Sequence, residues 1–176
     1  MKRLAPRKMM RKIKEMIGKI GLILSIFLSL SAPSYAQTIA EVANFVHTPF
    51  ELTNWLSHNF AYEMELPDHW QGAKETLELK KGDCEDFAIL NQAVLGQLGI
   101  ASEIVIVKFK GLNLSHAICI FKNGEFYSYF SNKELVQTKA RSIKEAIEKE
   151  YPDWEKLIFT NAKKENLKIV SNSNSL

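Results

Sequence analysis

The chain has 176 residues, of which 46% are hydrophobic, and a formal net charge of +3. Such a composition indicates a globular protein with one domain and one sizeable core. Residues 1–36 hold 8 of the 23 Lys and Arg residues and 1 of the 20 Asp and Glu residues, so the remaining 140 residues have a net charge of −4. No basic face with interleaved aromatic residues is left, which argues against nucleic acid as a partner.

Residues 1–36 predict a secretory signal peptide. Eight basic residues precede an apolar stretch over 20–30, and Ser34-Tyr35-Ala36 fits a cleavage signal. The apolar stretch has about 11 residues, short of the roughly 20 that span a bilayer, so we expect cleavage after Ala36 rather than a retained anchor. The mature protein would then be secreted or periplasmic and would have no stable membrane span.

The first half of the mature chain predicts helices. Apolar residues recur at helical spacing over 38–47 and over 50–60, on either side of Thr48-Pro49. Leu66-Pro67-Asp68 is typical of a turn. A short helix over about residues 72–80 should follow.

Cys84 follows Gly82-Asp83 and opens a stretch with apolar residues at helical spacing, which ends at Gly99. We therefore place Cys84 in the first turn of a helix, close to free backbone N–H groups and to the positive end of the helix dipole. That position stabilises a thiolate and lowers the pKa of a cysteine from its free value of about 8.5. Cys84 is thus a candidate nucleophile.

The second half predicts an antiparallel meander. Its β-branched and aromatic runs are typical of strands, and Asn123-Gly124 is a hairpin turn signal. Ser142 is a candidate N-cap for a further helix. The expected strands cover 104–109, 116–121, 125–130 and 154–160, and the expected helix covers 143–150. We place the domain over residues 37–165 and a polar tail over 166–176.

Cys84 and Cys119 are the only cysteines. In an oxidising compartment they could form one structural disulfide. We favour another interpretation, in which Cys119 is a buried small apolar residue. Cys119 follows His116 by three positions in a predicted strand, so it should face away if His116 faces Cys84.

Packing the Cys84 helix on the sheet can bring a helix-start residue beside a strand residue such as His116. A thiol and an imidazole in contact form a nucleophile in which histidine takes the thiol proton and later returns it to the leaving group. The predicted hairpin brings Ser131-Asn132 back towards His116, and the amide oxygen of Asn132 can accept an imidazole N–H. On spacing alone, a packed core histidine at position 116 explains the pattern equally well.

Several stretches together carry a family resemblance. They are Trp70-Gln71 through Glu75-Thr76-Leu77, Gly82 through Ala88, Leu98-Gly99-Ile100, and His116-Ala117 before Asn123-Gly124. They resemble the transglutaminase-like superfamily, and especially the bacterial transglutaminase-like cysteine proteinases, over about residues 45–135. The resemblance implies an α+β fold with a papain-like core, in which N-terminal helices and the nucleophile helix pack on an antiparallel sheet. It also implies a Cys-His-Asp triad, with Cys84 as nucleophile and His116 as base.

The third member of that triad departs from the family pattern. Family members often end the returning strand with an Asp-Asn pair, and here Ser131 occupies the position of the aspartate. A serine hydroxyl cannot offer a negative charge to an imidazolium. Asparagine orients the histidine in papain-like enzymes, so we expect Asn132 to complete the catalytic set. A site with reduced or lost activity is the alternative.

Asp83 and Glu85 flank the thiol. In the periplasmic adhesin-cleaving members of the related group, carboxylates at these positions bind calcium, for which carboxylate oxygens are suitable ligands. Capping of the helix by acidic residues is the simpler explanation, and no cofactor is expected to be required. Trp70-Gln71 could line the cleft or supply an oxyanion donor. A core or rim position is the simpler explanation for Trp70.

The sequence therefore favours an exported, monomeric cysteine hydrolase, a peptidase acting on a peptide or protein substrate through an acyl-thioester on Cys84. The alternative is a catalytically impaired domain that binds peptide or cell-wall material in the same cleft. Ser131 is the feature that favours this alternative.

Overall fold

The computed structural model describes residues 37–160 and 168–171. The expected signal peptide and the expected cleavage site lie outside the described residues. In the described part, no helix has the length and hydropathy needed to cross a membrane.

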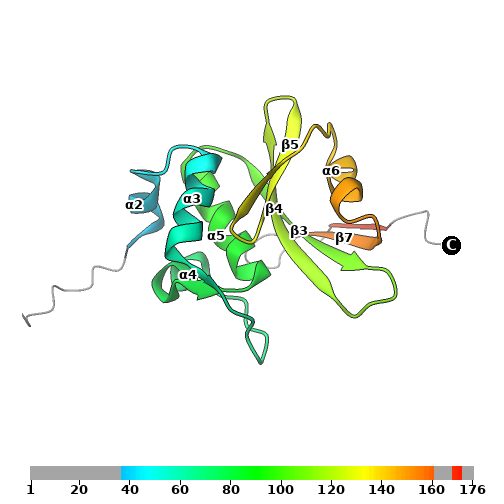
Figure 1. The fold of residues 1–176 in the computed structure, drawn as a ribbon, viewed down its shortest axis with the longest axis horizontal. Helices are drawn as coiled ribbons and strands as arrows, with labels where there is room; N and C mark the ends of the chain where they lie inside the picture. The colour runs from blue at the N-terminus through cyan, green and yellow to red at the C-terminus, as the bar shows by residue number, and fades with distance from the viewer. Residues whose placement is uncertain (1–36, 161–167, 172–176) are drawn as a thin grey trace, which may run out of the picture. The chain divides into compact units, whose positions relative to one another are not determined.

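The described residues form a six-stranded sheet with helices on both faces (Figure 1). The helices are α2 (Ile39–Ala43), α3 (Pro49–Asn59), α4 (Ala73–Leu79), α5 (Cys84–Gln97) and α6 (Ile143–Glu150). The sheet consists of β3 (Ser102–Phe109), β4 (Ser115–Asn123), β5 (Phe126–Ser131), β6 (Glu134–Gln137), β7 (Trp154–Thr160) and β8 (Lys168–Ser171). All strands in it pair antiparallel, in the order β6-β5-β4-β3-β7-β8, so the expected α+β fold is confirmed.

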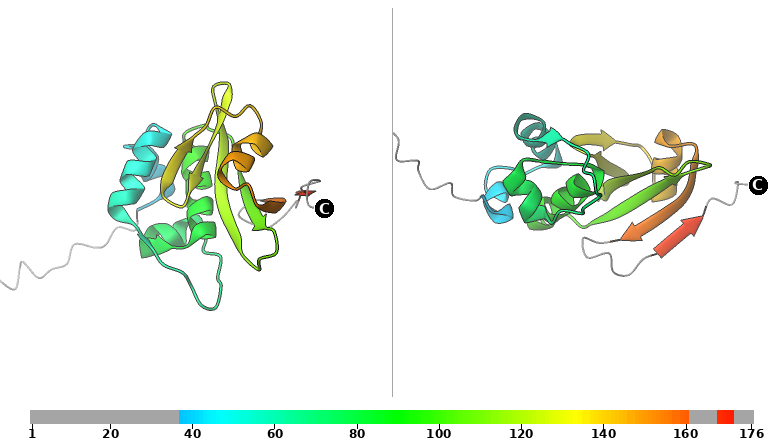
Figure 2. Two further views of the ribbon diagram at one scale, coloured as in Figure 1. Left: turned by 45° about the vertical axis from the view of Figure 1, so that its right-hand side comes forward. Right: turned by 90° about the horizontal axis from the view of Figure 1, so that it is seen from below.

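The two faces of the sheet bury two separate apolar clusters. α5 packs against β4, β3 and β5 on one face, and α6 packs near β5 on the other (Figure 2). Successive side chains of a strand point to opposite faces. On β4, Ala117 and Cys119 therefore belong to the cluster beneath α5, whereas Ile118 and Ile120 belong to the cluster beneath α6.

Local capping explains why several helices begin where the sequence predicts. The hydroxyl of Thr48 accepts the backbone N–H of Glu51 at 3.1 Å, and Pro49 occupies the first turn of α3. The hydroxyl of Ser142 accepts the backbone N–H of Glu145 at 3.1 Å at the start of α6. Because these signals lie within a few residues of each other, they can be recognised without tertiary information.

Two strands of the sheet were not predicted. β6 continues the meander after a tight turn, and its four residues are too few to show a clear alternation. β8 lies inside the stretch expected to be a polar tail, so that part of the prediction is wrong. It pairs with the edge of β7, with Ile169 opposite Ile158, and its partner strand supplies the hydrogen bonds that the short segment cannot make alone. A further short parallel pair joins β1 (Ala61–Tyr62) to β2 (Lys81–Gly82), directly before α5.

The turn between β5 and β6 is tied to the helical layer by side chains. The Thr53 hydroxyl on α3 donates to the carbonyl of Lys133 at 2.6 Å and accepts the N–H of Leu135 at 3.1 Å. The side-chain amide of Asn91 on α5 donates to the carbonyl of Asn132 at 2.8 Å. These contacts fix the end of β5, and with it Ser131, relative to the start of α5.

Candidate active site

The start of α5 is built around the carboxylate of Asp86. This side chain accepts the backbone N–H of Asp83 at 3.0 Å and that of Gln71 at 2.8 Å. Gly82 packs against it so closely that an added Cβ would lie 2.7 Å from the Asp86 Cβ. The expected helix start at Cys84 is thus confirmed, and a buried carboxylate joins it to the loop before α4.

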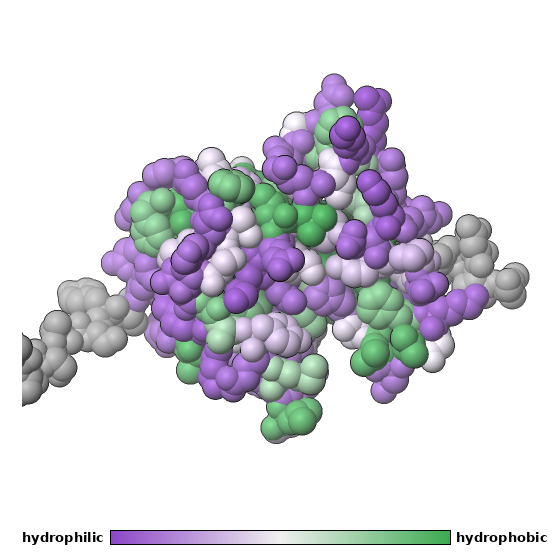
Figure 3. Space-filling model, in the orientation of Figure 1, coloured by the Kyte–Doolittle hydropathy of each residue, from purple (hydrophilic) through white to green (hydrophobic). Residues whose placement is uncertain are grey.

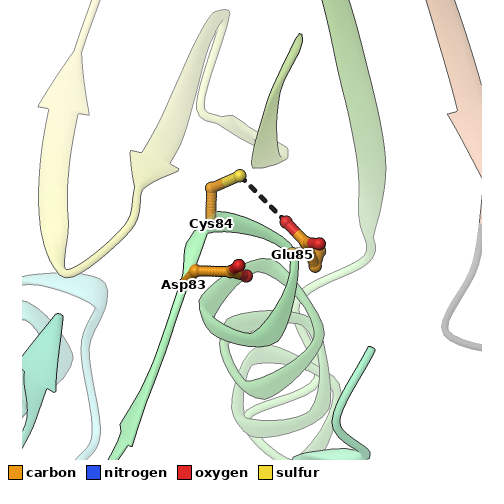
Figure 4. Close-up of side chains that lie close together, drawn as sticks. All are labelled: Asp83, Cys84 and Glu85. Atoms are coloured by element: carbon orange, nitrogen blue, oxygen red, sulfur yellow. Dashed lines mark hydrogen bonds between the residues drawn. The ribbon is translucent and has the colours of Figure 1, made fainter. Parts of the chain in front are cut away.

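The sulfur of Cys84 points out of the helix towards the strand ends (Figure 4). Its thiol donates to Oε2 of Glu85 at 3.0 Å. It also interacts with the backbone N–H of Ala117, which donates to the sulfur. Ala117 directly follows His116 on β4, so the fold brings the thiol to the start of this strand.

The ionisation of Cys84 differs from our expectation. Burial raises the pKa of the thiol to about 12, and the hydrogen bond to Glu85 and the negative charges of Glu85 and Asp83 act in the same direction. The Ala117 N–H opposes this rise without reversing it. The prediction of a lowered pKa is therefore wrong for the free protein, because burial and two neighbouring carboxylates outweigh the helix dipole. At neutral pH the group is a thiol.

His116 lies half-buried on β4, on the face of the sheet that α6 covers. Its Nε2 is 2.9 Å from the hydroxyl oxygen of Ser131, and its ring centroid is 5.9 Å from that of Tyr151. Burial lowers the pKa of His116, so the imidazole is neutral at pH 7. The charge of an ionised Cys84 would raise the pKa of Tyr151, which shows that the thiol, too, lies near this cluster.

Asn132 does not take the position that we expected. It lies in the turn after β5 with a φ of 54°, in the left-handed region. Its Oδ1 is buried without a hydrogen-bond partner among the described residues, so it accepts no hydrogen from the imidazole. Ser131 makes that contact instead, because it pairs with Ile118 and shares the face of His116. Sequence reasoning favoured Asn132 because its amide oxygen can accept an imidazole N–H, and it did not show which of the two neighbours faces the ring.

Three carboxylates gather beside the thiol. One oxygen each of Asp83 and Glu85 and the sulfur of Cys84 lie within 4.8 Å of one another, and Asp68 hydrogen-bonds to Glu85. Burial raises the pKa of Glu85 to about 7, and the bonds to Asp68 and Asp83 add to the rise. The buried Oδ1 of Asp83 has no partner within the described ranges. Sequence reasoning missed Asp68, whose only signal was its place in a turn, seventeen positions before Glu85.

A cleft of about 330 Å³ opens over the thiol. Trp70 lines it and also packs against the apolar core, so both roles considered for it are present, whereas Gln71 does not line the cleft. The Gln71 side chain is fully buried, and its amide donates to Glu65, so it is not placed to bind an oxyanion. The other lining residues are Asp68, Cys84, Glu85, Ile106, Lys108, Ser115, Ala117, Ile158 and Thr160.

Cys119 is fully buried, and neither cysteine forms a disulfide. Its expected role as a small core residue is confirmed. Cys119 faces away from His116, as a separation of three positions along a strand predicts, since His116 packs on Tyr151 on the α6 face. The expectation that it would also face away from Cys84 is wrong, because Cys119 packs beneath α5, in the cluster that Cys84 borders.

A family model described as a transglutaminase-like domain matches residues 24–150 of this chain. No curated protein sequence is significantly similar to the chain.

Solved structures provide the fold comparison. A candidate cysteine protease from Cytophaga hutchinsonii is 20% identical with a TM-score of 0.53, over 84% of this chain and 52% of that one. EGTA-treated LapG from Legionella pneumophila is 22% identical with a TM-score of 0.50, over 73% of this chain and 72% of LapG. The calcium-bound form of LapG is 22% identical with a TM-score of 0.47, over 71% of this chain and 72% of LapG. At this level of identity, the likeness concerns the fold.

Proposed function

Since the chain belongs to the transglutaminase-like domain family, we propose that it hydrolyses peptide bonds through an acyl-thioester on Cys84. The observation that carries the proposal is the position of Cys84. Its thiol lies at the start of a helix, inside a cleft, and touches the backbone next to a neutral histidine. Export by the signal sequence in residues 1–36 is part of the same proposal.

The proposed reaction begins with transfer of the thiol proton to His116. Nε2 of this ring is bonded to Ser131, which leaves Nδ1 to accept the proton. The sulfur attacks the carbonyl carbon, and the developing oxyanion is stabilised by the backbone N–H of Cys84, which has no acceptor within its helix. His116 then protonates the departing amine and the acyl-thioester forms. In the second half, His116 takes a proton from water, the hydroxide attacks the thioester, and the thiol is restored.

The shape of the surface around the thiol supports an extended peptide as the substrate. Two projections flank a hollow in Figure 3, and each has hydrophobic groups at its tip. They are the loop between β1 and α4 and the turn between β3 and β4, whose bases contribute Trp70, Lys108 and Ser115 to the cleft. Large exposed apolar side chains on these two segments are Met64, Leu66, Leu112 and Leu114, and Tyr62 at the end of β1 directly precedes the first segment.

The acidic cluster supports calcium as a ligand in this proposal. Asp83 and Glu85, with Asp68 beside them, offer the oxygen atoms that calcium prefers, and the unpartnered Oδ1 of Asp83 is one of them. A bound cation would supply positive charge where these carboxylates crowd one another. The simpler role of helix capping accounts for Asp83 and Asp86 but not for Glu85, which bonds to the thiol.

The second candidate function is peptide binding without cleavage. The observations that favour it are the uncharged partner of His116 and the thiol pKa of about 12. Both features make the thiolate–imidazolium pair of Cys84 and His116 harder to form than in a site where a carboxylate bonds to the histidine.

The test uses residues 37–176 and a peptide library whose cleavage is followed by mass spectrometry, with calcium and with EGTA. We expect the wild type to cleave peptides and Cys84→Ala to cleave them at least about 1000-fold more slowly. Cys119→Ala, the matched control, should retain the activity of the wild type. Mass spectrometry should also detect the acyl group on Cys84. If the wild type retains library peptides but releases no products, the binding function is correct and the hydrolase is not. Equal rates in calcium and EGTA would remove the cation from the proposal.

A further inference from the structure

The cleft over Cys84 is lined by negative charge from the helical layer and by positive charge from the sheet. Asp68, in the loop before α4, and Glu85, on α5, contribute carboxylates, and Lys108 on β3 contributes an ammonium group. Among the described residues that line the cleft, Lys108 is the only cation. A substrate in the cleft therefore meets opposite charges at the helical wall and at the sheet wall.

The ammonium group of Lys108 has no counter-ion in the described part of the chain. It forms neither an ion pair nor a hydrogen bond with any described residue. Its neighbour on β7 is Lys156, which pairs with Glu155, and like charges directly opposite each other on two strands repel. The positive charge of Lys108 is therefore available to an anion that enters the cleft.

The strand register places Lys108 close to the thiol. On β3 and β4, Lys108 lies opposite Ser115, and Ile106 lies opposite Ala117. These four side chains share the face of the sheet on which α5 packs. The backbone N–H of Ala117 donates to the sulfur of Cys84. The pair of Lys108 and Ser115 thus lies two residues, about 7 Å, farther along the strands, a distance that an extended peptide also covers in two residues.

The sheet wall between the thiol and Lys108 is apolar. Ile106 lies opposite Ala117 on one side and Ile158 on the other, and all three line the cleft. Such a surface favours an apolar side chain, whereas the ammonium group at its end favours an anion. The hydroxyl of Ser115, directly opposite Lys108, can donate to the same anion. The anion that a peptide carries is a carboxylate, in an Asp or Glu side chain or at the C-terminus.

We propose that Lys108, together with the Ser115 hydroxyl, binds a carboxylate of the peptide substrate about two residues from the scissile bond and so selects acidic peptides. This inference rests on the proposed function for the peptide substrate. Asp68 and Glu85 repel a carboxylate from the helical wall, so the charges of the cleft also orient the peptide.

The first test measures binding to residues 37–176 carrying Cys84→Ala, which retains peptides without cleaving them. The probes are fluorescein-labelled octapeptide libraries with Glu, Gln or Lys fixed at one position, each with a C-terminal carboxylate or amide. Fluorescence polarisation should show binding about fivefold tighter for Glu than for Gln at one position, the effect of a favourable ion pair. If the C-terminal group is the one bound, the carboxylate libraries should instead bind tighter than the amides whatever the fixed residue.

Charge reversal then separates Lys108 from the net charge of the protein. In the Cys84→Ala background, Lys108→Gln should abolish the preference for carboxylates, and Lys108→Glu should reverse it in favour of Lys. Lys156→Glu is the matched control, because it changes the charge equally, directly opposite Lys108, but at a residue that does not line the cleft. Lys156→Glu should keep the preference. An equal loss in the two charge reversals, or a preference that survives in Lys108→Gln, would overturn the inference.

Cleavage by the wild type distinguishes failure of this inference from failure of the proposed function. Acidic peptides should have a lower KM at unchanged kcat, because the carboxylate lies away from the reacting atoms. If the wild type cleaves acidic and neutral peptides equally well, the inference is wrong and the hydrolase stands. If it cleaves nothing while Lys108 still selects acidic peptides, the hydrolase is wrong and the inference stands. If no library binds, both are wrong.

Discussion

Cys84 combines a position that favours a thiolate with neighbours that oppose one. The helix start and the Ala117 N–H stabilise negative charge on the sulfur, whereas burial and the carboxylates of Asp83 and Glu85 keep the proton on it. A nucleophile of this kind is protonated at rest and ionises only when His116 takes its proton. A change that moves the carboxylates of Asp83 and Glu85 away from the sulfur should make proton transfer from the thiol to His116 easier.

The burial of His116 gives stability a defined dependence on pH. Burial holds the pKa of His116 below its ordinary value of 6.5, so the folded state binds fewer protons than the unfolded state just below that pH. The stabilising contribution of the neutral ring is complete above pH 6.5 and is lost as pH falls through that value towards the lower folded pKa. Between about pH 7.5 and about pH 5.5, the free energy of unfolding measured in urea should therefore fall more for the wild type than for His116→Gln. Equal losses in the two proteins would contradict this assignment.

At the scale of elements, α5 determines where the chemistry can occur. Its first turn carries the thiol, its capping carboxylate Asp86 holds the loop that contains Gln71, and its body is buried against the sheet. The helix leaves no room at its start, because Gly82 approaches Asp86 without a Cβ between them. A small displacement there would move the thiol relative to β4.

The two glycines next to and within α5 offer a matched comparison. In Gly82→Ala the new Cβ would lie 2.7 Å from Asp86, and the overpacking should cost about 1–3 kcal/mol of unfolding free energy. In Gly96→Ala the new Cβ meets nothing within 4 Å, and the better helix former should add about 0.5–1 kcal/mol. Urea unfolding of both variants measures these changes. The packing argument fails if Gly82→Ala is as stable as the wild type.

At the scale of the whole described domain, the helical layer and the sheet must keep one relative position for the site to exist. The thiol comes from the helical layer, while His116 and Ser131 come from the sheet. Besides the shared apolar core, the turn after Ser131 connects the layers through bonds from Thr53 and Asn91. Lys133 reaches back from the same turn and donates to the carbonyl of Phe60 at 2.8 Å.

Thr53 should contribute to stability through its hydroxyl. Thr53→Val keeps the shape of the side chain but leaves the carbonyl of Lys133 and the N–H of Leu135 without their partner. We expect Thr53→Val to lose about 1–3 kcal/mol of unfolding free energy and to show faster hydrogen exchange at the Leu135 amide. Thr53→Ser should retain most of the stability of the wild type. Thermal unfolding and exchange measured by NMR provide the test. Identical behaviour of the two variants would show that the hydroxyl has no such role.

Local signals explain what could be predicted. The capping residues Thr48 and Ser142, the Asn123-Gly124 turn and the apolar spacing after Cys84 each act within a few residues, so the corresponding helices and strands are present in the structure. The predicted nucleophile and base were recognised in the same way, from a helix start and a strand start together with the family resemblance. Their catalytic roles remain part of the proposed function.

The sequence by itself determined the α+β class, the helix that begins at Cys84 and the strand that carries His116, because these follow from periodicity and capping. Only the tertiary structure decided which side chain meets the His116 ring. Ser131 bonds to the ring and Tyr151 packs beside it, whereas the buried Oδ1 of Asn132, in a left-handed turn, bonds to no described residue. The tertiary structure also decided the state of the thiol, since burial and the approach of Asp68 and Glu85 depend on how distant segments pack. Backbone conformation and desolvation arise from the whole fold, and no local pattern of residues encodes them.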